Sequence, residues 1–411
     1  MPKLSFLYIL FCLSLLFCGC SIWEIREQTK QIESIGSIKG SVEFDGKQTG
    51  PIIVLRFLDE NGLPVFQSKV IATEKGEFAF SVLPGEYYIA AFIDSNRDGI
   101  HQPDEYGNYY GNPSPITIVP QQTVILEPII ITGTFPKLQT DVKPLIKTKR
   151  VWTNIGQIAE LNDSRFQRAN YALGFWKPGD FLDKAEGGVF FLEEYQDSKI
   201  PVLLVHGAVG GPADWESVIN GIDRQHFQPW IFYYPSGLRL DMISDYLVEA
   251  VTRLQHRYGF TEMEVVAHSM GGLVTRSFIK KYIEHDSENL NRIGLVVTVN
   301  SPMAGMPDAA SGLKFSPVVV SSWHDVAPES EFLGEIHSWN WPQEIPYHLV
   351  ISYVQGESGD GVVPLERQAP LKLQIESAHT FVFNDDHSGT LSDSHFLDLL
   401  NGILSSRIPK K

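Results

Sequence analysis

The stretch EVVAHSMGG, at residues 264–272, constrains the fold of this chain more than any other. An apolar run leads into Ser269 and the helix-like sequence LVTRSFIKKYI follows it, so the order predicts a strand, a sharp turn and a helix. The small residues Ala267 and Gly271 let the backbone make this turn. A serine hydroxyl becomes an effective nucleophile only beside a base and backbone donors, and the apex of such a turn exposes it to both.

The composition is that of a globular protein, with 43% hydrophobic and 20% charged residues over a length of 411, which is enough for two domains. The formal net charge is -16, which disfavours nucleic acid and anionic membrane surfaces as electrostatic partners. We therefore expect no nucleic-acid partner.

Residues 1–20 have the pattern of a targeting segment, with Lys3 before an apolar run that is short for a bilayer span. The segment ends in FCGC and resembles a bacterial lipoprotein signal. The resemblance implies a lipid anchor on Cys20, a membrane partner through that anchor, and export to the cell envelope, at the outer membrane or a periplasm-facing membrane. An uncleaved anchor helix and a soluble export signal are the alternatives. All three cysteines lie here, so we expect no disulfide in the exported body.

Residues 21–37 are polar and predict a tether, and residues 38–133 predict a small antiparallel β-sandwich. Short runs rich in Val, Ile, Phe and Tyr alternate with turn signals in this region. The runs cover residues 37–44, 51–58, 65–73, 76–82, 86–93 and 123–132. The stretch GEFAFSVLPGEYYIAAFID resembles the sandwich domains appended to secreted carboxypeptidases and bacterial surface proteins.

The loop DSNRDGIHQPDE has the ligand order of a calcium loop: oxygen ligands at its first, third, fifth, seventh and twelfth positions, and glycine at its sixth. A structural Ca²⁺ is therefore expected here, held by side-chain oxygens and one main-chain carbonyl. The alternative is a turn of Asp, Asn and Gly that satisfies its own polar groups. The candidate ligands are Asp94, Asn96, Asp98, Ile100 and Glu105.

Residues 134–199 are expected to form a linker and a lead-in, with a helix at 155–171 and a strand at 188–195. Strand and helix patterns then alternate through residues 200–405. This alternation predicts a mostly parallel sheet covered by helices on both faces.

Four motifs carry a family resemblance: PVLLVHGAVGG, YYPSG, AHSMGG, and a late Asp followed by His. Together they resemble the α/β-hydrolase superfamily, and most closely bacterial lipases and the lipase-like hydrolases related to GPI inositol-deacylases. The resemblance covers about residues 200–404, and it implies a serine esterase with the chain order Ser, Asp, His.

The resemblance implies that Ser269 is the nucleophile. The base should follow the last strand, where FVFNDDHSG supplies His387, with His395 as the alternative. The acid should follow the preceding strand, where Asp360 lies in a DGVVP context, with Glu357 as the runner-up.

The oxyanion donors are expected to be the main-chain N–H groups of Met270 and, by resemblance, of Ala208. No zinc-type cluster is evident in the sequence of this domain, so we expect no cofactor for catalysis. Residues 302–346 should form a cap. Its methionines and aromatic residues would favour lipid substrates if exposed, or would pack the cap onto the sheet if buried.

These expectations define a serine hydrolase that cleaves carboxylic esters, lipid or acyl esters in particular, through an acyl-enzyme. Acyl transfer, thioesterase and amidase activities on the same fold are alternatives, because the leaving group is selected by pocket shape. A surface-anchored binding or adhesion lipoprotein with little catalysis is the alternative from another class.

Overall fold

The computed structural model describes residues 22–408, apart from 61, 74, 112 and 135–153. The described residues form two compact units. The larger contains 22–29, 154–250 and 260–408, and the smaller contains 30–134 and 251–259. The predicted lipoprotein signal and Cys20 lie outside the described residues. Within the described part of the chain, no helix has the length and apolarity needed to cross a membrane.

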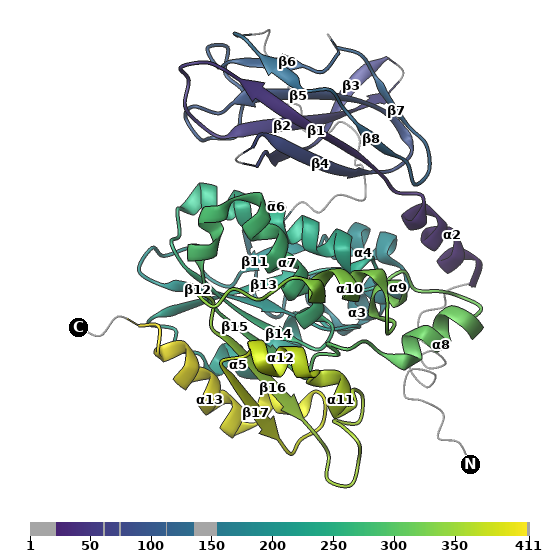
Figure 1. Cartoon of the computed structure of the whole chain (residues 1–411), viewed down its shortest axis with the longest axis vertical. Coiled ribbons are helices and arrows are strands. Elements are labelled where there is room, and N and C mark those ends of the chain that lie inside the picture. Colours follow the sequence, from purple (N-terminus) through teal and green to yellow (C-terminus); the bar gives the residue numbers. More distant parts are fainter. Residues whose placement is uncertain (1–21, 61, 74, 112, 135–153, 409–411) are drawn as a thin grey trace. The chain divides into compact units, whose positions relative to one another are not determined.

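The smaller unit is a two-sheet β-structure (Figure 1). One sheet has the order β4-β1-β8, with β9 also pairing with β1, and the other has the order β3-β2-β5-β6, with β7 pairing with β5. The strands are β1 (Gly36–Phe44), β2 (Ile52–Glu60), β3 (Leu63–Ile71), β4 (Glu77–Val82), β5 (Gly85–Ile93), β6 (Gly107–Tyr109), β7 (Ile116–Ile118), β8 (Thr123–Ile125) and β9 (Ile129–Ile131).

The sandwich differs from the expectation after β5, where β6 and β7 form short strands that were not expected. The run at 123–132 forms two short strands that pair parallel to β1, so the sandwich is not purely antiparallel. Side chains from both sheets meet in one buried cluster, because alternate residues of each strand point to the same face. Ile38 of β1, Phe80 of β4 and Ile89 of β5 belong to this cluster.

The expected tether is wrong over most of its length, because residues Ile22–Glu33 form the helix α2. Residues 22–29 of this helix belong to the larger unit, and several of their side chains contact the rest of that unit. Glu24 pairs with Lys177 at 2.5 Å, and the Gln28 amide donates to Asp180 at 2.8 Å. Since a buried lysine needs a charge partner, the contact with Lys177 favours a docked helix over a free tether.

The larger unit contains an eight-stranded sheet with the order β10-β11-β13-β12-β14-β15-β16-β17. Neighbouring strands are parallel except for β11 and β13, which are antiparallel. The strands are β10 (Asn154–Ile158), β11 (Gly188–Phe191), β12 (Ile200–Val205), β13 (Phe227–Tyr233), β14 (Met263–His268), β15 (Ile293–Val299), β16 (Tyr347–Ser352) and β17 (His379–Phe383).

The expected boundary at residue 200 is too late, because β10 and β11 extend this sheet and are not a linker. The expected helix at 155–171 is also wrong. Pairing of β10 with β11 overrides the local helical pattern. Asp163 then caps a 3₁₀ turn, Ser164–Phe166, and α3 begins only at Arg168.

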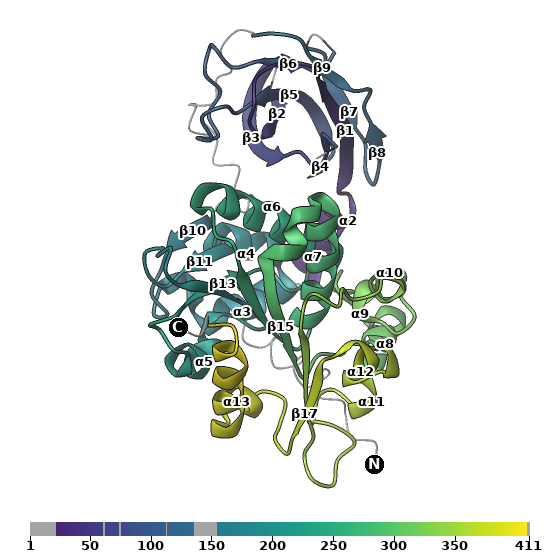
Figure 2. The same cartoon turned by 60° about the vertical axis from the view of Figure 1, so that its left-hand side comes forward.

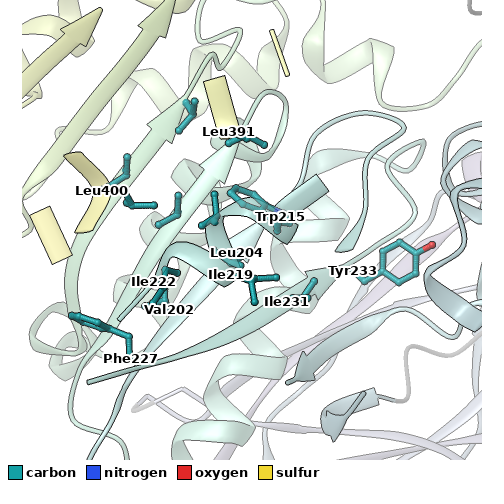
Figure 3. Packing of buried hydrophobic residues seen from close by; sticks show 14 of the residues in the cluster. Val202, Leu204, Trp215, Ile219, Ile222, Phe227, Ile231, Tyr233, Leu391 and Leu400 are labelled. Carbon is teal, nitrogen blue, oxygen red and sulfur yellow. The ribbon is translucent and has the colours of Figure 1, made fainter. Parts of the chain in front are cut away.

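Helices cover both faces of the sheet (Figures 1 and 2). Helices α5 (Glu216–Gly221) and α13 (Ser394–Ser405) pack on one face, where Val202, Leu204 and Trp215 are fully buried (Figure 3). The remaining helices are α3 (Arg168–Trp176), α4 (Pro178–Lys184), α6 (Leu240–Tyr258), α7 (Gly271–His285), α8 (Pro307–Phe315), α9 (Trp323–Val326), α10 (Glu331–Ser338), α11 (Leu365–Gln368) and α12 (Leu371–Glu376). Further 3₁₀ turns are Pro212–Trp215, Ser287–Arg292 and Gly389–Ser392.

The expected cap at residues 302–346 forms α8, α9 and α10, and its aromatic residues mostly pack inward. Trp323, Phe332 and Trp341 are buried, whereas Phe315 is 75% exposed. The burial of these rings supports the alternative in which the segment packs onto the sheet, and not the alternative in which it exposes an apolar surface.

Candidate functional site

Ser269 lies at the apex of the turn between β14 and α7, with a φ of 55°. Two glycines make room for this turn. A Cβ added at Gly271 would lie 2.3 Å from the Val205 carbonyl oxygen, and one added at Gly207 would lie 2.6 Å from the Ser269 Cβ. The positive φ of a non-glycine residue is a strained geometry, which the surrounding strands hold in place.

His387 lies between Ser269 and Asp360. Its Nε2 atom is 2.9 Å from the Ser269 Oγ, and its Nδ1 atom is 2.7 Å from the Asp360 Oδ2. A carboxylate on Nδ1 favours the tautomer with hydrogen on that nitrogen and leaves Nε2 free to accept the serine proton. The three residues therefore form one continuous hydrogen-bonded chain.

Each of these side chains follows the carboxyl end of a different strand. Ser269 follows β14, Asp360 lies in the loop after β16, and His387 lies in the loop after β17. The carboxyl ends of parallel strands meet at one edge of the sheet, which brings residues that are far apart in sequence together. The main-chain N–H of His387 also donates to the carbonyl of Asp360 at 2.9 Å, joining the last two loops directly.

The alternative base and acid lie in unsuitable places. The His395 side chain is 87% exposed and faces Asp393, at 3.5 Å. Glu357 is exposed, whereas Asp360 is 1% exposed. His387 and Asp360 are within hydrogen-bonding distance of each other, and His387 is within hydrogen-bonding distance of Ser269.

The loop after β12 carries the first expected oxyanion donor. In the described part of the chain, the main-chain N–H groups of Ala208 and Met270 donate no hydrogen bond to the protein, whereas Val209 N–H donates to the Ser236 Oγ at 3.0 Å. An unsatisfied N–H beside a nucleophile can bind a developing oxyanion. The structure thus leaves both expected donors available.

His206 braces the base of this loop. Its ring stacks on Tyr234 with 4.0 Å between ring centroids, and the Tyr234 hydroxyl donates to the His206 carbonyl at 2.5 Å. Burial lowers the pKa of His206 to about 4, so its imidazole is neutral at ordinary pH. These contacts agree with a bracing role for His206.

Two residues that the sequence did not single out lie beside His387. His268 and Asn300 both donate to its main-chain carbonyl, at 2.8 and 3.0 Å. His268 directly precedes the nucleophile and could have been flagged from that position. Asn300 follows β15, and nothing in its sequence surroundings marks it.

The candidate calcium loop is held largely by its own hydrogen bonds. Asp94 accepts the N–H groups of Asp98 and Gly99, and Glu105 accepts those of Ser95 and Gln102. Burial raises the pKa of Asp94, and the charge of Glu105 adds to the rise.

The oxygen ligands in this loop suit a hard cation. However, the Lys69 ammonium donates to the Gly99 carbonyl, and among the described residues no group of three or more His, Cys, Asp or Glu side chains is arranged to hold a metal ion. Calcium binding here stays a prediction.

The order of strands, the turn at Ser269 and the loops that follow the strands define the class of the larger unit, which has the α/β-hydrolase fold. A family model described as "Alpha/beta hydrolase of unknown function (DUF915)" matches residues 239–382. The matched region contains Ser269 and Asp360 and ends before His387.

Several solved structures are similar over about half to two thirds of the chain. A Listeria innocua gene product is 17% identical and has a TM-score of 0.40, over 52% of this chain and 96% of that one. The mature lipase BlEst2 of Bacillus licheniformis is 15% identical and has a TM-score of 0.43, over 53% and 97%. Aspergillus fumigatus lipase B is 14% identical and has a TM-score of 0.40, over 67% and 63%. These values are too low to transfer an activity to this chain. No curated protein sequence matched it.

Proposed function

We propose that the chain is a serine hydrolase that cleaves carboxylic esters through an acyl-enzyme intermediate. The observation that carries the proposal is the hydrogen-bonded chain from Ser269 through His387 to Asp360. This series of hydrogen bonds activates a serine that is otherwise a poor nucleophile.

In the first half of the reaction, the Ser269 Oγ attacks the ester carbonyl carbon and passes its proton to the His387 Nε2. The developing oxyanion accepts hydrogen bonds from the main-chain N–H groups of Ala208 and Met270. The bond between the carbonyl carbon and the alkoxy oxygen then breaks, and the leaving alcohol takes the proton from His387. Asp360 orients the imidazole and stabilises its charged form.

In the second half, a water molecule attacks the acyl carbon and gives a proton to His387. The bond to the Ser269 Oγ breaks, the serine recovers the proton, and the carboxylic acid leaves. If an alcohol takes the place of water, the product is a new ester, so acyltransferase activity needs no additional residue. A thioester or an amide could be cleaved by the same steps.

The lipid or acyl nature of the ester rests on the resemblance of the AHSMGG and HGAVGG motifs to bacterial lipases. A binding or adhesion lipoprotein is less well supported, because a degraded site would be expected to have lost at least one of the aligned side chains or open donors.

Labelling with a fluorophosphonate tests the proposal, followed by p-nitrophenyl ester assays over acyl chain length. We expect the wild type to be labelled, Ser269→Ala to be unlabelled, and His387→Ala to lose about a thousandfold or more in kcat. His395→Ala is the matched control and should keep wild-type rates. Labelling that persists in Ser269→Ala would remove the nucleophile assignment, and a wild type inactive on every ester would favour the binding alternative.

The predicted signal at residues 1–20 supports an exported protein held at the cell envelope by a lipid on Cys20. Metabolic labelling with radioactive palmitate tests this location. We expect labelled protein in the membrane fraction, and loss of the label in Cys20→Ala. Unlabelled wild-type protein in the soluble fraction would contradict it.

A further inference from the structure

The main-chain carbonyl of His387 is held by two side chains from neighbouring strands. The Nε2 of His268, at the end of β14, lies 2.8 Å from this oxygen, and the Nδ2 of Asn300, directly after β15, lies 3.0 Å from it. Both side chains are buried, with exposed fractions of 8% and 0%. A carbonyl oxygen has two lone pairs, so both hydrogen bonds can form together.

His268 can only be the donor in its bond, because a carbonyl carries no hydrogen. Its imidazole must therefore hold a hydrogen on Nε2. Burial is the main cause that lowers the pKa of His268 to about 3, and the neighbouring His387 and His206 contribute to this shift. The residue thus stays a neutral donor and adds no positive charge beside His387, whose ring centroid is 4.7 Å away.

Asn300 holds a second point of the same loop. Its amide also donates to the Thr390 Oγ1 at 3.1 Å, and the Thr390 hydroxyl donates to the Asp386 carbonyl at 3.2 Å. The backbone of Asn300 has a φ of 51°, a conformation that Asn tolerates better than most residues. This backbone conformation directs the Asn300 amide toward the loop that carries His387.

We propose that His268 and Asn300 are positioning residues, which form a two-donor clamp on the His387 carbonyl and hold its imidazole in line with Ser269 and Asp360. This inference rests on the proposed serine-hydrolase function. A displacement of a catalytic group by about 1 Å can cost about a hundredfold in rate. The clamp acts on the main chain of His387, so its loss should lower kcat and leave KM nearly unchanged.

The test compares two substitutions at one position in the full-length protein. His268→Phe keeps a ring but removes the donor, and His268→Gln keeps a donor near the place of Nε2. We expect kcat for a p-nitrophenyl ester to fall about 10- to 100-fold in His268→Phe, with KM within about twofold of wild type. His268→Gln should recover most of the loss. His348→Phe is the matched control, because His348 is a partly buried histidine on β16 outside the site, and it should keep the wild-type kcat.

A second variant keeps the test decisive if His268→Phe does not fold. Asn300→Asp has the same shape and tolerates the same backbone conformation, but it replaces the donating amide by a carboxylate that cannot donate. We expect a similar loss of kcat, and losses that are less than additive when Asn300→Asp is combined with His268→Phe.

Active-site titration with fluorophosphonate separates positioning from folding. Each variant should bind the full stoichiometric amount of reagent but react more slowly than wild type. Wild-type kcat in both His268→Phe and Asn300→Asp would overturn the clamp. A loss of kcat explained by a matching loss of titratable Ser269 would also overturn it, because the role would then be structural. If the wild type itself is not labelled, the proposed function fails, independently of the clamp.

Discussion

The Nδ1 of His387 lies 2.7 Å from the Oδ2 of Asp360. The other carboxylate oxygen accepts the main-chain N–H groups of Val362 and Val363, at 2.9 and 2.6 Å. One oxygen thus fixes the carboxylate to its own loop, while the other is left to orient the imidazole. The valines of the DGVVP sequence supply the N–H groups that fix the Asp360 carboxylate. An aspartate without these bonds would be oriented less well toward His387.

Asp360→Asn should lower kcat about 10²- to 10⁴-fold. An amide can turn its N–H groups toward the His387 Nδ1 and so favour the wrong tautomer, while the fold is retained. Ester hydrolysis at saturating substrate measures the effect. Glu357→Gln, at the exposed alternative position, is the control and should change kcat less than twofold. Equal losses in the two variants would contradict the assignment of the acid.

Gly207→Ala should reduce kcat/KM about 10- to 100-fold. The added Cβ would lie 2.6 Å from the Cβ and 3.0 Å from the Oγ of Ser269, so the nucleophile must move. The control is Gly334→Ala in α10, where an added Cβ meets nothing within 4 Å. That variant should keep its activity and gain about 0.5–1 kcal/mol in free energy of unfolding, because alanine favours a helix. Unchanged activity in Gly207→Ala would contradict the tight contact.

Glu264, fully buried on β14, should make stability depend on pH. Burial is the main cause that raises its pKa from 4.5 to about 8; the charge of Glu262 contributes to this rise, and Arg407 opposes it. The folded state holds this proton more tightly than the unfolded state. The stabilising contribution is therefore complete below about pH 4.5 and is lost as the pH rises toward 8.

Glu264→Gln should remove this dependence, since an amide does not ionise. We expect the variant to lose less stability than wild type between pH 5 and 9, by an amount on the order of a few kcal/mol. Urea unfolding at several pH values measures it. Glu216→Gln, an exposed carboxylate on α5, is the control. Parallel pH profiles for wild type and Glu264→Gln would show that Glu264 ionises normally.

The loop at residues 94–105 should respond to calcium. A cation among Asp94, Asp98 and Glu105 would relieve the repulsion that contributes to the raised pKa of Asp94. We expect millimolar calcium to raise the melting temperature of the sandwich transition by several degrees, at about 4–8 °C for each kcal/mol. Glu105→Gln should abolish the shift. Equal melting curves with calcium and with chelator would favour a loop that satisfies its own polar groups.

The prediction of the fold class is confirmed, and it depended on strong local patterns. The apolar runs PVLLVH and MEVVA mark strands β12 and β14, since strands covered on both faces lack polar alternation. The strand predicted at 188–195 is present as β11, but residues 154–187 were predicted poorly for the opposite reason. The strand β10 is short, and it is a strand because β11 lies beside it, a partner more than thirty residues away.

The sequence by itself determined which residue types this protein can use for chemistry and on which strand ends they lie, because strand, turn and helix signals are local. Only the tertiary structure decided that His387 rather than His395 meets Ser269, and that His268 and Asn300 hold its carbonyl. Those contacts join residues 87 to 119 positions apart, and no local pattern encodes such pairings. They exist because parallel strands deliver their carboxyl ends to one edge of the sheet.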